Sequence, residues 1–238
     1  QIRSSAASDV YKRQLIDYCL VGEPTSNKKV ADSARIGRRG SLGGHLQIFG
    51  KQGHVAYPEN VENPIFLSSD LITDLKNKKW DNGNAIFDPT SFQISNIHSG
   101  TGAHNVVPGE LDLYFNFRYS TESTEESLKS EFENIIKNLN LKYDLKWSLN
   151  GNPYLTENKF LKEIIVSACE EVNGYKPDLN AKGGTSDGRF IAKMKTEIIE
   201  LGPINESIHQ IDENIKISEL WTLKDIYTKV LFKLNQQL

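Results

Sequence analysis

The chain has 238 residues, of which 38% are hydrophobic and 25% are charged. This length and composition are those of an ordinary globular protein with one large domain or two small ones. The formal net charge is −3 and the lysines are interleaved with acidic residues, so nothing indicates a surface for nucleic acid or an anionic membrane. No apolar run approaches the length of a membrane span and no signal peptide opens the sequence, so we expect no membrane partner.

The two cysteines, Cys19 and Cys169, are far apart and lie within apolar segments. Such positions favour buried, reduced thiols over a disulfide. Because reduced thiols are typical of the cytoplasm, we expect a cytoplasmic protein.

The first residues differ from the rest of the chain. Residues 1–14 are polar and rich in small side chains, and they show neither a strand period nor a helix period. They pass abruptly into residues 15–21, an apolar run that predicts a buried strand. We therefore predict that residues 1–14 are an unstructured or foreign lead-in, and we expect the true domain to begin further upstream.

The middle of the chain alternates between the period of a half-buried strand and the period of an amphipathic helix. In chain order the patterns predict a strand at 42–48, a helix at 67–80, strands at 92–97 and 111–118, a helix at 128–139 and a strand at 143–149. Ser123 and Glu126 are spaced as a capping box before the second helix. This β-α-β-β-α-β order predicts a ferredoxin-like sheet with both helices on one side.

The segments outside this block predict a second kind of domain. An amphipathic helix is expected at 160–172, a β-branched strand at 196–201 and a final helix at 218–234. Strands and helices that flank an inserted α+β unit indicate an α/β domain split by a smaller one. We predict that residues 15–39 and 151–238 are parts of the α/β domain and that residues 40–150 form the insert.

Two polar residues follow predicted strands of the α/β domain. Glu23 comes directly after the 15–21 strand, and His209 lies beyond the 196–201 strand. Open α/β sheets bind ligands at the carboxyl ends of their strands, so these two side chains are candidate metal ligands. Taken alone, a glutamate before proline commonly caps or forms a salt bridge, and a lone histidine is commonly structural.

Four further segments carry polar groups that could bind a ligand. Gly183–Arg189 is glycine-rich but lacks the ending of a phosphate loop. Its backbone could approach a ligand, with Thr185 and Ser186 as hydrogen-bond donors, or it could be a tight turn before a helix. His54 and Asn105 lie in turns of the inserted domain, and Arg118 lies on the polar face of its strand. Polar groups in such places are also common on ordinary protein surfaces.

The motifs occur in one order along the chain: Val21–Thr25, Gly37–Leu42, Gly50–Pro58, Asn105–Glu110, Gly183–Arg189, and Glu200–Pro203 with His209. That order resembles the aminoacylase/carboxypeptidase family of two-zinc metallohydrolases, from about Ile16 to the C-terminus. The resemblance implies an α/β fold, part of a zinc-peptidase-like catalytic domain, with an inserted ferredoxin-like α+β dimerisation domain. It also implies hydrolysis of N-succinyl-LL-2,6-diaminopimelate to succinate and LL-2,6-diaminopimelate, a step in lysine and cell-wall precursor synthesis.

The resemblance assigns a role to each matching residue. It implies that Glu23 and His209 are ligands of two zinc ions, with cobalt as a possible replacement, and that His54 reaches the partner subunit of a homodimer and helps hold the oxyanion. The positions that match groups binding the small-molecule substrate are Arg38, Tyr57, Asn105, Arg118, Gly184, Thr185 and Asn205. Arginines suit a doubly anionic substrate because a guanidinium can bind a carboxylate through two hydrogen bonds.

The chain departs from the family's pattern in its first segment. The family also uses an upstream histidine, a bridging aspartate and a Glu-Glu pair. This sequence has no histidine before His45, and its only acids before Glu23, Asp9 and Asp17, lie in no matching motif. We therefore expect this chain by itself to be a fragment that neither holds a dinuclear site nor turns over substrate.

Two other functions stay open. One is that of a sister N-acyl amino acid deacylase, such as an acetylornithine deacetylase, against which Arg38, Arg118 and Gly183–Arg189 argue. The other is that of a non-catalytic dimerisation or regulatory module.

Overall fold

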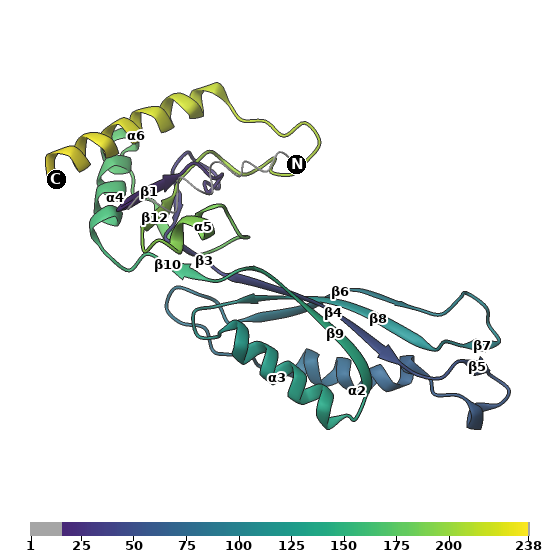
Figure 1. Ribbon diagram of the computed structural model, residues 1–238. Helices are drawn as coiled ribbons and strands as arrows, with labels where there is room; N and C mark the ends of the chain where they lie inside the picture. The colour runs from purple at the N-terminus through teal and green to yellow at the C-terminus, as the bar shows by residue number, and fades with distance from the viewer. Residues whose placement is uncertain (1–15, 238) are drawn as a thin grey trace. The chain divides into compact units, whose positions relative to one another are not determined.

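The computed structural model describes residues 16–237, which form two compact units (Figure 1). One unit is Arg39–Pro153, and the other combines the segments before Arg39 and after Pro153. The predicted lead-in, 1–14, lies outside the described residues. The roles expected for 15–39, 40–150 and 151–238 stay predictions.

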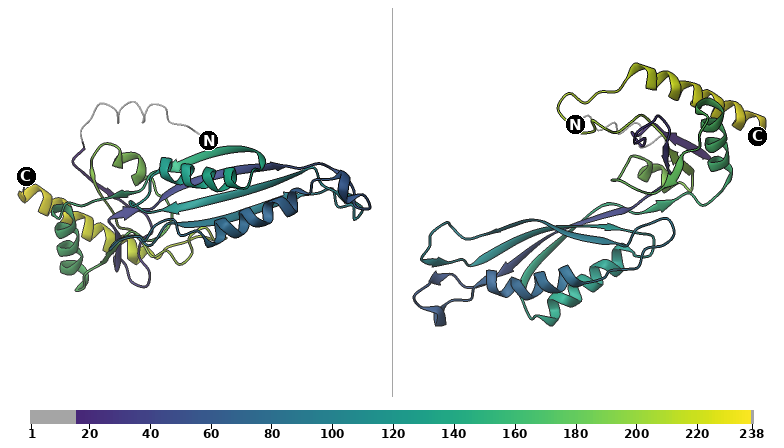
Figure 2. Two further views of the ribbon diagram at one scale, coloured as in Figure 1. Left: turned by 90° about the horizontal axis from the view of Figure 1, so that it is seen from below. Right: turned by 180° about the vertical axis from the view of Figure 1, so that it is seen from behind.

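The Arg39–Pro153 unit is an antiparallel sheet with the strand order β6-β8-β4-β9. Its elements are β4 (Gly40–Phe49), α2 (Pro64–Asn77), β6 (Ser91–Ser99), β8 (Glu110–Tyr119), α3 (Glu125–Asn138) and β9 (Lys142–Gly151). Both helices lie on the same side of the sheet, as Figure 2 shows from two further directions. The predicted β-α-β-β-α-β order is therefore confirmed.

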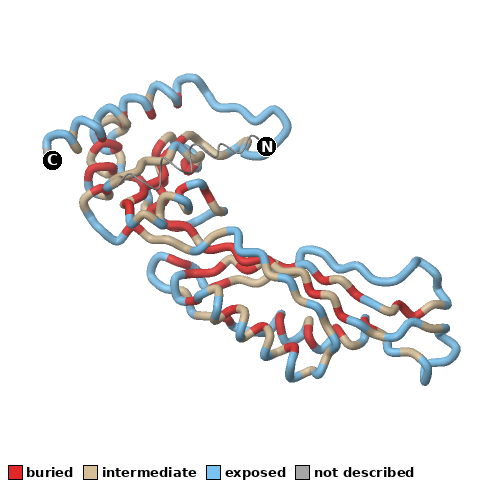
Figure 3. Tube along the Cα trace, in the orientation of Figure 1, coloured by how far each residue is buried: buried red, intermediate tan, exposed pale blue. Residues whose placement is uncertain are grey.

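The core of this unit fills the space between the sheet and its two helices. Buried and exposed residues alternate along β8, so one face of the strand packs and the other is open (Figure 3). On the packed face the ring of Phe115 stacks on that of Phe132 from α3, with centroids 4.5 Å apart. Gly44 leaves room for Phe115, because a Cβ there would lie 2.2 Å from its ring.

The second helix begins one residue later than the predicted capping box. Thr124 is the N-cap of α3, and its side chain and that of Ser127 each accept from the other's backbone N–H. The prediction of Ser123 and Glu126 was wrong because the Ser123 hydroxyl donates instead to Asp81, at 2.7 Å.

The other unit is built on a four-stranded sheet with the order β1-β12-β2-β11. Its elements are β1 (Tyr18–Val21), β2 (Ser33–Arg35), β3 (Gly37–Arg38), β10 (Tyr154–Leu155), α4 (Phe160–Asn173), β11 (Asp178–Asn180), α5 (Gly188–Ala192), β12 (Glu197–Glu200) and α6 (Ile217–Gln237). Strands β1 and β12 are parallel neighbours, with Tyr18 opposite Glu197 and Val21 opposite Glu200. Helices α4 and α6 pack on the sheet through residues such as Ile165 and Ile226, both fully buried.

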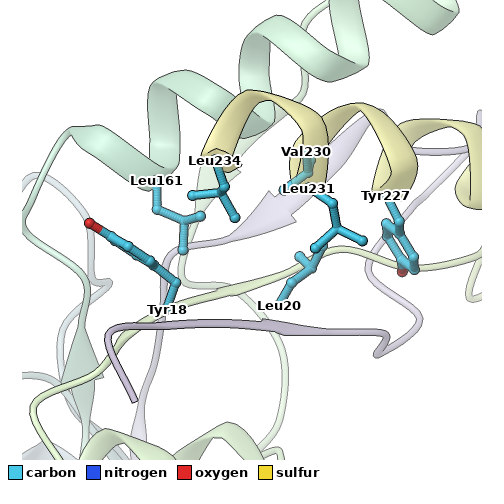
Figure 4. A pocket seen from close by; sticks show the side chains of 7 residues that line it. All are labelled: Tyr18, Leu20, Leu161, Tyr227, Val230, Leu231 and Leu234. Carbon is cyan, nitrogen blue, oxygen red and sulfur yellow. The ribbon is translucent and has the colours of Figure 1, made fainter. Parts of the chain in front are cut away.

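An apolar hollow of about 260 Å³ lies between β1, α4 and α6 (Figure 4). Its walls are two phenol rings and five aliphatic side chains: Tyr18, Leu20, Leu161, Tyr227, Val230, Leu231 and Leu234. The hollow contains none of the predicted site residues, so it is separate from the candidate site.

The cysteines and the lengths of the helices can also be compared with the expectations from the sequence. Both cysteines are free; Cys169 is buried, which raises its pKa to about 12, whereas Cys19 is only half-buried. Within residues 16–237, no helix has the length and apolar character needed to cross a membrane. The cytoplasmic location stays a prediction.

Asp81 joins three segments of the Arg39–Pro153 unit. Its carboxylate accepts hydrogen bonds from the backbone N–H groups of Gly83 (2.9 Å) and Thr90 (2.8 Å) and from the hydroxyls of Thr90, Ser120 (2.9 Å) and Ser123 (2.7 Å). Partial burial by itself raises the pKa of Asp81, but these hydrogen bonds outweigh it and lower the pKa to about 2.

We predict that Asp81→Ala lowers the free energy of unfolding by about 1–3 kcal/mol at pH 7, because several buried donors lose one acceptor. The measurement is urea unfolding of the whole chain by tryptophan fluorescence. Because the folded pKa lies below the ordinary value near 4, the contribution is complete above about pH 4 and disappears as the pH falls through about 2. The exposed Asp70→Ala is the control; a difference from wild type that stays constant down to pH 2 would contradict the prediction.

Candidate functional site

The carboxyl ends of β1 and β12 bring two distant segments into direct contact. The N–H of Leu201 donates to the carbonyl of Val21 at 2.9 Å, and the N–H of Ser26 donates to the carbonyl of Pro203 at 3.1 Å. Gly202 lies so close to Glu23 that an added Cβ would be 2.1 Å from its carbonyl oxygen. The segment that follows Glu23 and the segment that leads to Asn205 therefore lie side by side at one edge of the sheet, the edge that the carboxyl ends of β1 and β12 form.

A buried arginine supports this edge from inside the sheet. Arg35 donates to the carbonyl of Thr25 at 3.1 Å and to the side chain of Asn180 at 2.8 Å. The N–H of Asn205 donates to the carbonyl of Ser26 at 3.0 Å. These bonds fix the backbone just after the predicted ligand Glu23, and the bond from Leu201 to Val21 fixes it just before.

The two predicted metal ligands differ in their surroundings. Glu23 is half-buried at the strand edge, whereas His209 is exposed in a turn with φ of +60°. Among residues 16–237, no group of three or more histidine, cysteine, aspartate or glutamate side chains is arranged to hold a metal ion. A catalytic zinc site takes about three protein ligands. Both ligand roles, and the expectation that this chain alone holds no dinuclear site, stay predictions.

Glu200, at the end of β12, is the centre of a buried hydrogen-bond network. Its carboxylate is fully buried and accepts from Arg38 through Nε (2.8 Å) and Nη2, from the hydroxyl of Tyr154 and from the hydroxyl of Ser186. Arg38 also donates through Nη1 to the carbonyl of Lys182 at 3.1 Å. One carboxylate thus connects β3, β10, β12 and the glycine-rich segment.

The glycine-rich segment passes too close to this network for other residues at two positions. Gly183 has φ of +99°, and a Cβ there would lie 2.6 Å from Nη1 of Arg38. A Cβ on Gly188 would lie 2.5 Å from the hydroxyl of Tyr154. Between them Gly184 is exposed with open space around it and Thr185 is half-buried. Arg38 and Glu200 hold the segment on its buried side, and Gly184 and Thr185 remain accessible.

Three other predicted residues meet at one end of the Arg39–Pro153 unit. His54 lies in β5 (Gly53–His54), which pairs with β7 (Val106–Val107), and the N–H of Val55 donates to the carbonyl of Asn105 at 3.1 Å. The ring of Tyr57 lies 5.9 Å from that of His54, centroid to centroid. All three predicted residues, His54, Tyr57 and Asn105, are exposed.

A backbone hydrogen bond determines the tautomer of the neutral His54 ring. The N–H of Ala56 donates to Nδ1 of His54 at 3.1 Å, so Nδ1 is an acceptor. In the neutral imidazole the proton then lies on Nε2, which leaves Nε2–H free to donate to a ligand.

Arg118 lies at the opposite end of the same unit. It pairs across β4 with Ser41, beside the point where the chain enters the unit at Arg39. Arg118 is eight positions beyond Glu110 in β8, which corresponds to about 27 Å along the strand. Burial, and then the charge of Arg39, lower the pKa of Arg118. Arg118 and His54 of one chain therefore cannot contact the same small ligand.

Sequence reasoning missed Glu200 and Tyr154 as members of the site, and it took Ser186 as a hydrogen-bond donor to a ligand, whereas the Ser186 hydroxyl donates to Glu200. Glu200 reads as one residue of a strand pattern, and Tyr154 lies in a two-residue strand that has no period to detect. The only available signal for Ser186 was its place inside the glycine-rich segment.

Comparison with known proteins agrees with the fold and with the motifs. Residues 36–144 match the family described as the peptidase dimerisation domain. Among solved structures, the chain resembles a tripeptidase from Staphylococcus aureus (TM-score 0.74, 20% identity, 90% of this chain and 56% of that one). It also resembles an M20 family metallo-carboxypeptidase from Sulfolobus solfataricus (TM-score 0.75, 14% identity, 88% and 61%). The fold is thus that of M20 peptidases with their dimerisation domain, and the predicted fold class is confirmed.

The similarity in sequence is more specific. The chain is 51% identical over 94% of its length to the succinyl-diaminopimelate desuccinylase of Hydrogenovibrio crunogenus, and 51% identical over 91% to that of Nitrosospira multiformis. It is therefore homologous, along nearly its whole length, to the succinyl-diaminopimelate desuccinylases, which confirms the family resemblance drawn from the motifs. It spans 59% and 57% of the length of these two relatives.

We predict that Gly183→Ala lowers the free energy of unfolding by about 1–3 kcal/mol, because alanine is strained at positive φ and its Cβ would displace the anchored Arg38. Gly184→Ala, one residue further, has open space and is expected to change stability by no more than about 0.5 kcal/mol. Thermal unfolding of the two variants measures the difference. Equal unfolding temperatures for both would show that the close approach at Gly183 is unimportant.

Proposed function

We propose that this chain is the part of a zinc-dependent amidohydrolase that binds substrate and forms the dimer, in an enzyme that hydrolyses N-succinyl-LL-2,6-diaminopimelate. The carrying observation is the 51% identity to succinyl-diaminopimelate desuccinylases over 94% of the chain. Every predicted site residue except Arg38 has an exposed or half-buried place, in which a side chain or backbone N–H can reach a ligand. Because the chain spans less than two thirds of the length of these relatives, we propose the activity for the longer enzyme and not for this chain alone.

Glu23 and His209 are the metal ligands that this chain contributes in the proposal. Glu23 follows β1 and His209 follows β12, so both start from the same sheet edge. The remaining ligands of two zinc ions, with cobalt as a replacement, and the general base come from outside the described residues.

The succinyl group and the amino acid carboxylates of the substrate need hydrogen-bond donors. The backbone N–H of Gly184, the hydroxyl of Thr185 and the side-chain amide of Asn205 lie on the edge and segment described above. Arg118 supplies a positive charge from the inserted unit. Arg38 was predicted to bind substrate as well, and three of its five N–H groups are already used by Glu200 and Lys182.

His54 acts as an oxyanion donor in the proposal. Its Nε2–H is free because Nδ1 accepts from Ala56, and a donor of this kind commonly stabilises the transition state by about 3 kcal/mol. Since His54 and Arg118 lie at opposite ends of one unit, His54 serves the site of a second copy. A homodimer formed through residues 40–150 provides that arrangement, in accord with the matched dimerisation domain.

A full-length protein tests the substrate. Residues 16–238 are joined to the part of the Hydrogenovibrio crunogenus relative that has no counterpart here, and zinc is supplied. We predict hydrolysis of N-succinyl-LL-2,6-diaminopimelate at least about a hundredfold faster, in kcat/KM, than of an N-acetyl amino acid, because the site binds the additional carboxylate of the succinyl group. A preference for the N-acetyl substrate would favour the sister deacylase, and no hydrolysis of either a non-catalytic module.

Two substitutions test the ligands in that full-length protein. Glu23→Gln and His209→Asn are each expected to reduce bound zinc and to lower kcat by about a hundredfold or more. The exposed Glu163→Gln on α4 is the matched control. Zinc content and kcat equal to those of the control would remove Glu23 or His209 from the site.

The oligomeric state is a separate prediction. We expect this chain to have the mass of a dimer in light scattering, because it contains residues 36–144, which match the dimerisation domain. A monomeric mass at all concentrations up to about 100 µM would contradict dimerisation through 40–150.

A further inference from the structure

The buried carboxylate of Glu200 has no role in the proposed chemistry, yet three segments of the chain depend on it. Both of its oxygens are used: Oε2 accepts from Arg38, and Oε1 accepts from Tyr154 and Ser186. Arg38 is 8% exposed and Ser186 is 4% exposed, so solvent cannot readily replace either partner. A buried ionised group of this kind is tolerated only when its partners are in place.

The partners of Glu200 lie on both sides of the accessible pair Gly184 and Thr185. Before the pair, Arg38 donates to the carbonyl of Lys182 and lies against Gly183. After the pair, Ser186 donates directly to Glu200. None of the backbone N–H groups from 183 to 188 donates in the hydrogen bonds found among turns and loops, and the carbonyls of Ser186 and Asp187 accept only from the nearby Arg189 and Phe190. The bonds that join this segment to the strands therefore involve side chains.

We infer that Glu200 is a positioning residue, whose buried carboxylate fixes segment 183–188 in the conformation that presents Gly184 and Thr185 to the substrate. The inference rests on the proposed function, because that function supplies the substrate. The fixed conformation of segment 183–188 can be measured without it. Glutamine is a poor replacement for glutamate here: its amide oxygen can accept from Arg38, but the negative charge is lost, and the Tyr154 and Ser186 hydroxyls would have to turn round to accept from its amide nitrogen. Glu200→Gln therefore weakens the bonds to Arg38 and rearranges those of the Tyr154–Ser186 pair.

Trypsin cleavage after Lys182 reports opening of the segment. Lys182 is exposed, but its carbonyl is bound by Arg38, so cleavage requires local release. In native digests of the whole chain, Glu200→Gln and Ser186→Ala are expected to raise the initial cleavage rate after Lys182 by about tenfold and about threefold, respectively. Cleavage after the exposed Lys79, in the other unit, stays at the wild-type rate and serves as an internal control.

Tyr154→Phe is the matched control variant. It removes a hydroxyl donor to the same oxygen, Oε1, but from β10 and not from the segment. The inference predicts a smaller rise after Lys182 for Tyr154→Phe than for Ser186→Ala. If the two variants open the segment equally, or if cleavage after Lys79 rises in parallel, Glu200 supports the unit as a whole and the inference is overturned. Should Glu200→Gln fail to fold, Ser186→Ala against Tyr154→Phe decides alone.

The full-length protein supplies the second readout. Ser186→Ala is expected to raise KM for the N-succinyl substrate about threefold or more while kcat stays within about twofold, because binding and not chemistry is affected. An unchanged KM in an active protein, with faster cleavage after Lys182, would show that the segment is fixed by Glu200 but does not bind substrate, and would overturn the inference. If the wild-type full-length protein is inactive, the proposed function fails, and the cleavage rates still decide whether Glu200 fixes the segment.

Discussion

Parallel pairing between β1 and β12 is the interaction on which the candidate site depends. The four pairs from Tyr18–Glu197 to Val21–Glu200 join residues that are 179 positions apart in the sequence. Beyond the last pair, the two backbones stay in contact because Gly202 has no side chain to separate them. The same last pair places Glu200 beneath the edge, where its carboxylate orders Arg38 and the glycine-rich segment. One short ladder thus positions both the proposed metal ligand Glu23 and the support of the segment that is proposed to bind substrate.

The Arg39–Pro153 unit, in contrast, keeps its predicted site residues apart. The β4–β8 ladder is ten residues long, and the predicted residues lie at its two ends. Arg118 lies near the start of β4, while His54, Tyr57 and Asn105 lie beyond its far end. A rigid sheet filled with stacked aromatic rings such as Phe115 and Phe132 cannot bend to bring them together. The proposed dimer accounts for this distance, since a second copy supplies the His54 that the same chain cannot bring to the ligand of its own Arg118.

Much of this fold could be predicted because its long elements carry strong periods. The alternation along residues 111–118 and the helical stripe from 128 to 139 each gave an element of the correct type. Strands β2, β3, β10 and β11 have two or three residues, too few for any period, and only tertiary pairing defines them. The same limit applies to the site: Glu23 and Gly183–Arg189 could be predicted from position and motif, and they stay predictions. The role of Glu200 depends on Arg38, Tyr154 and Ser186, which are distant in sequence and meet only in the folded chain.

Mixing two inactive full-length proteins tests the central claim, that residues of this chain serve two sites in a dimer. One carries His54→Ala and the other His209→Asn, and each alone is expected to lack activity. After subunit exchange at equal amounts, the account predicts recovery of about a quarter of the wild-type activity, since half of the dimers are mixed and each holds one intact site. No recovery, with mixed dimers demonstrated by mass spectrometry, would contradict the account, because His54 would then act only within its own chain.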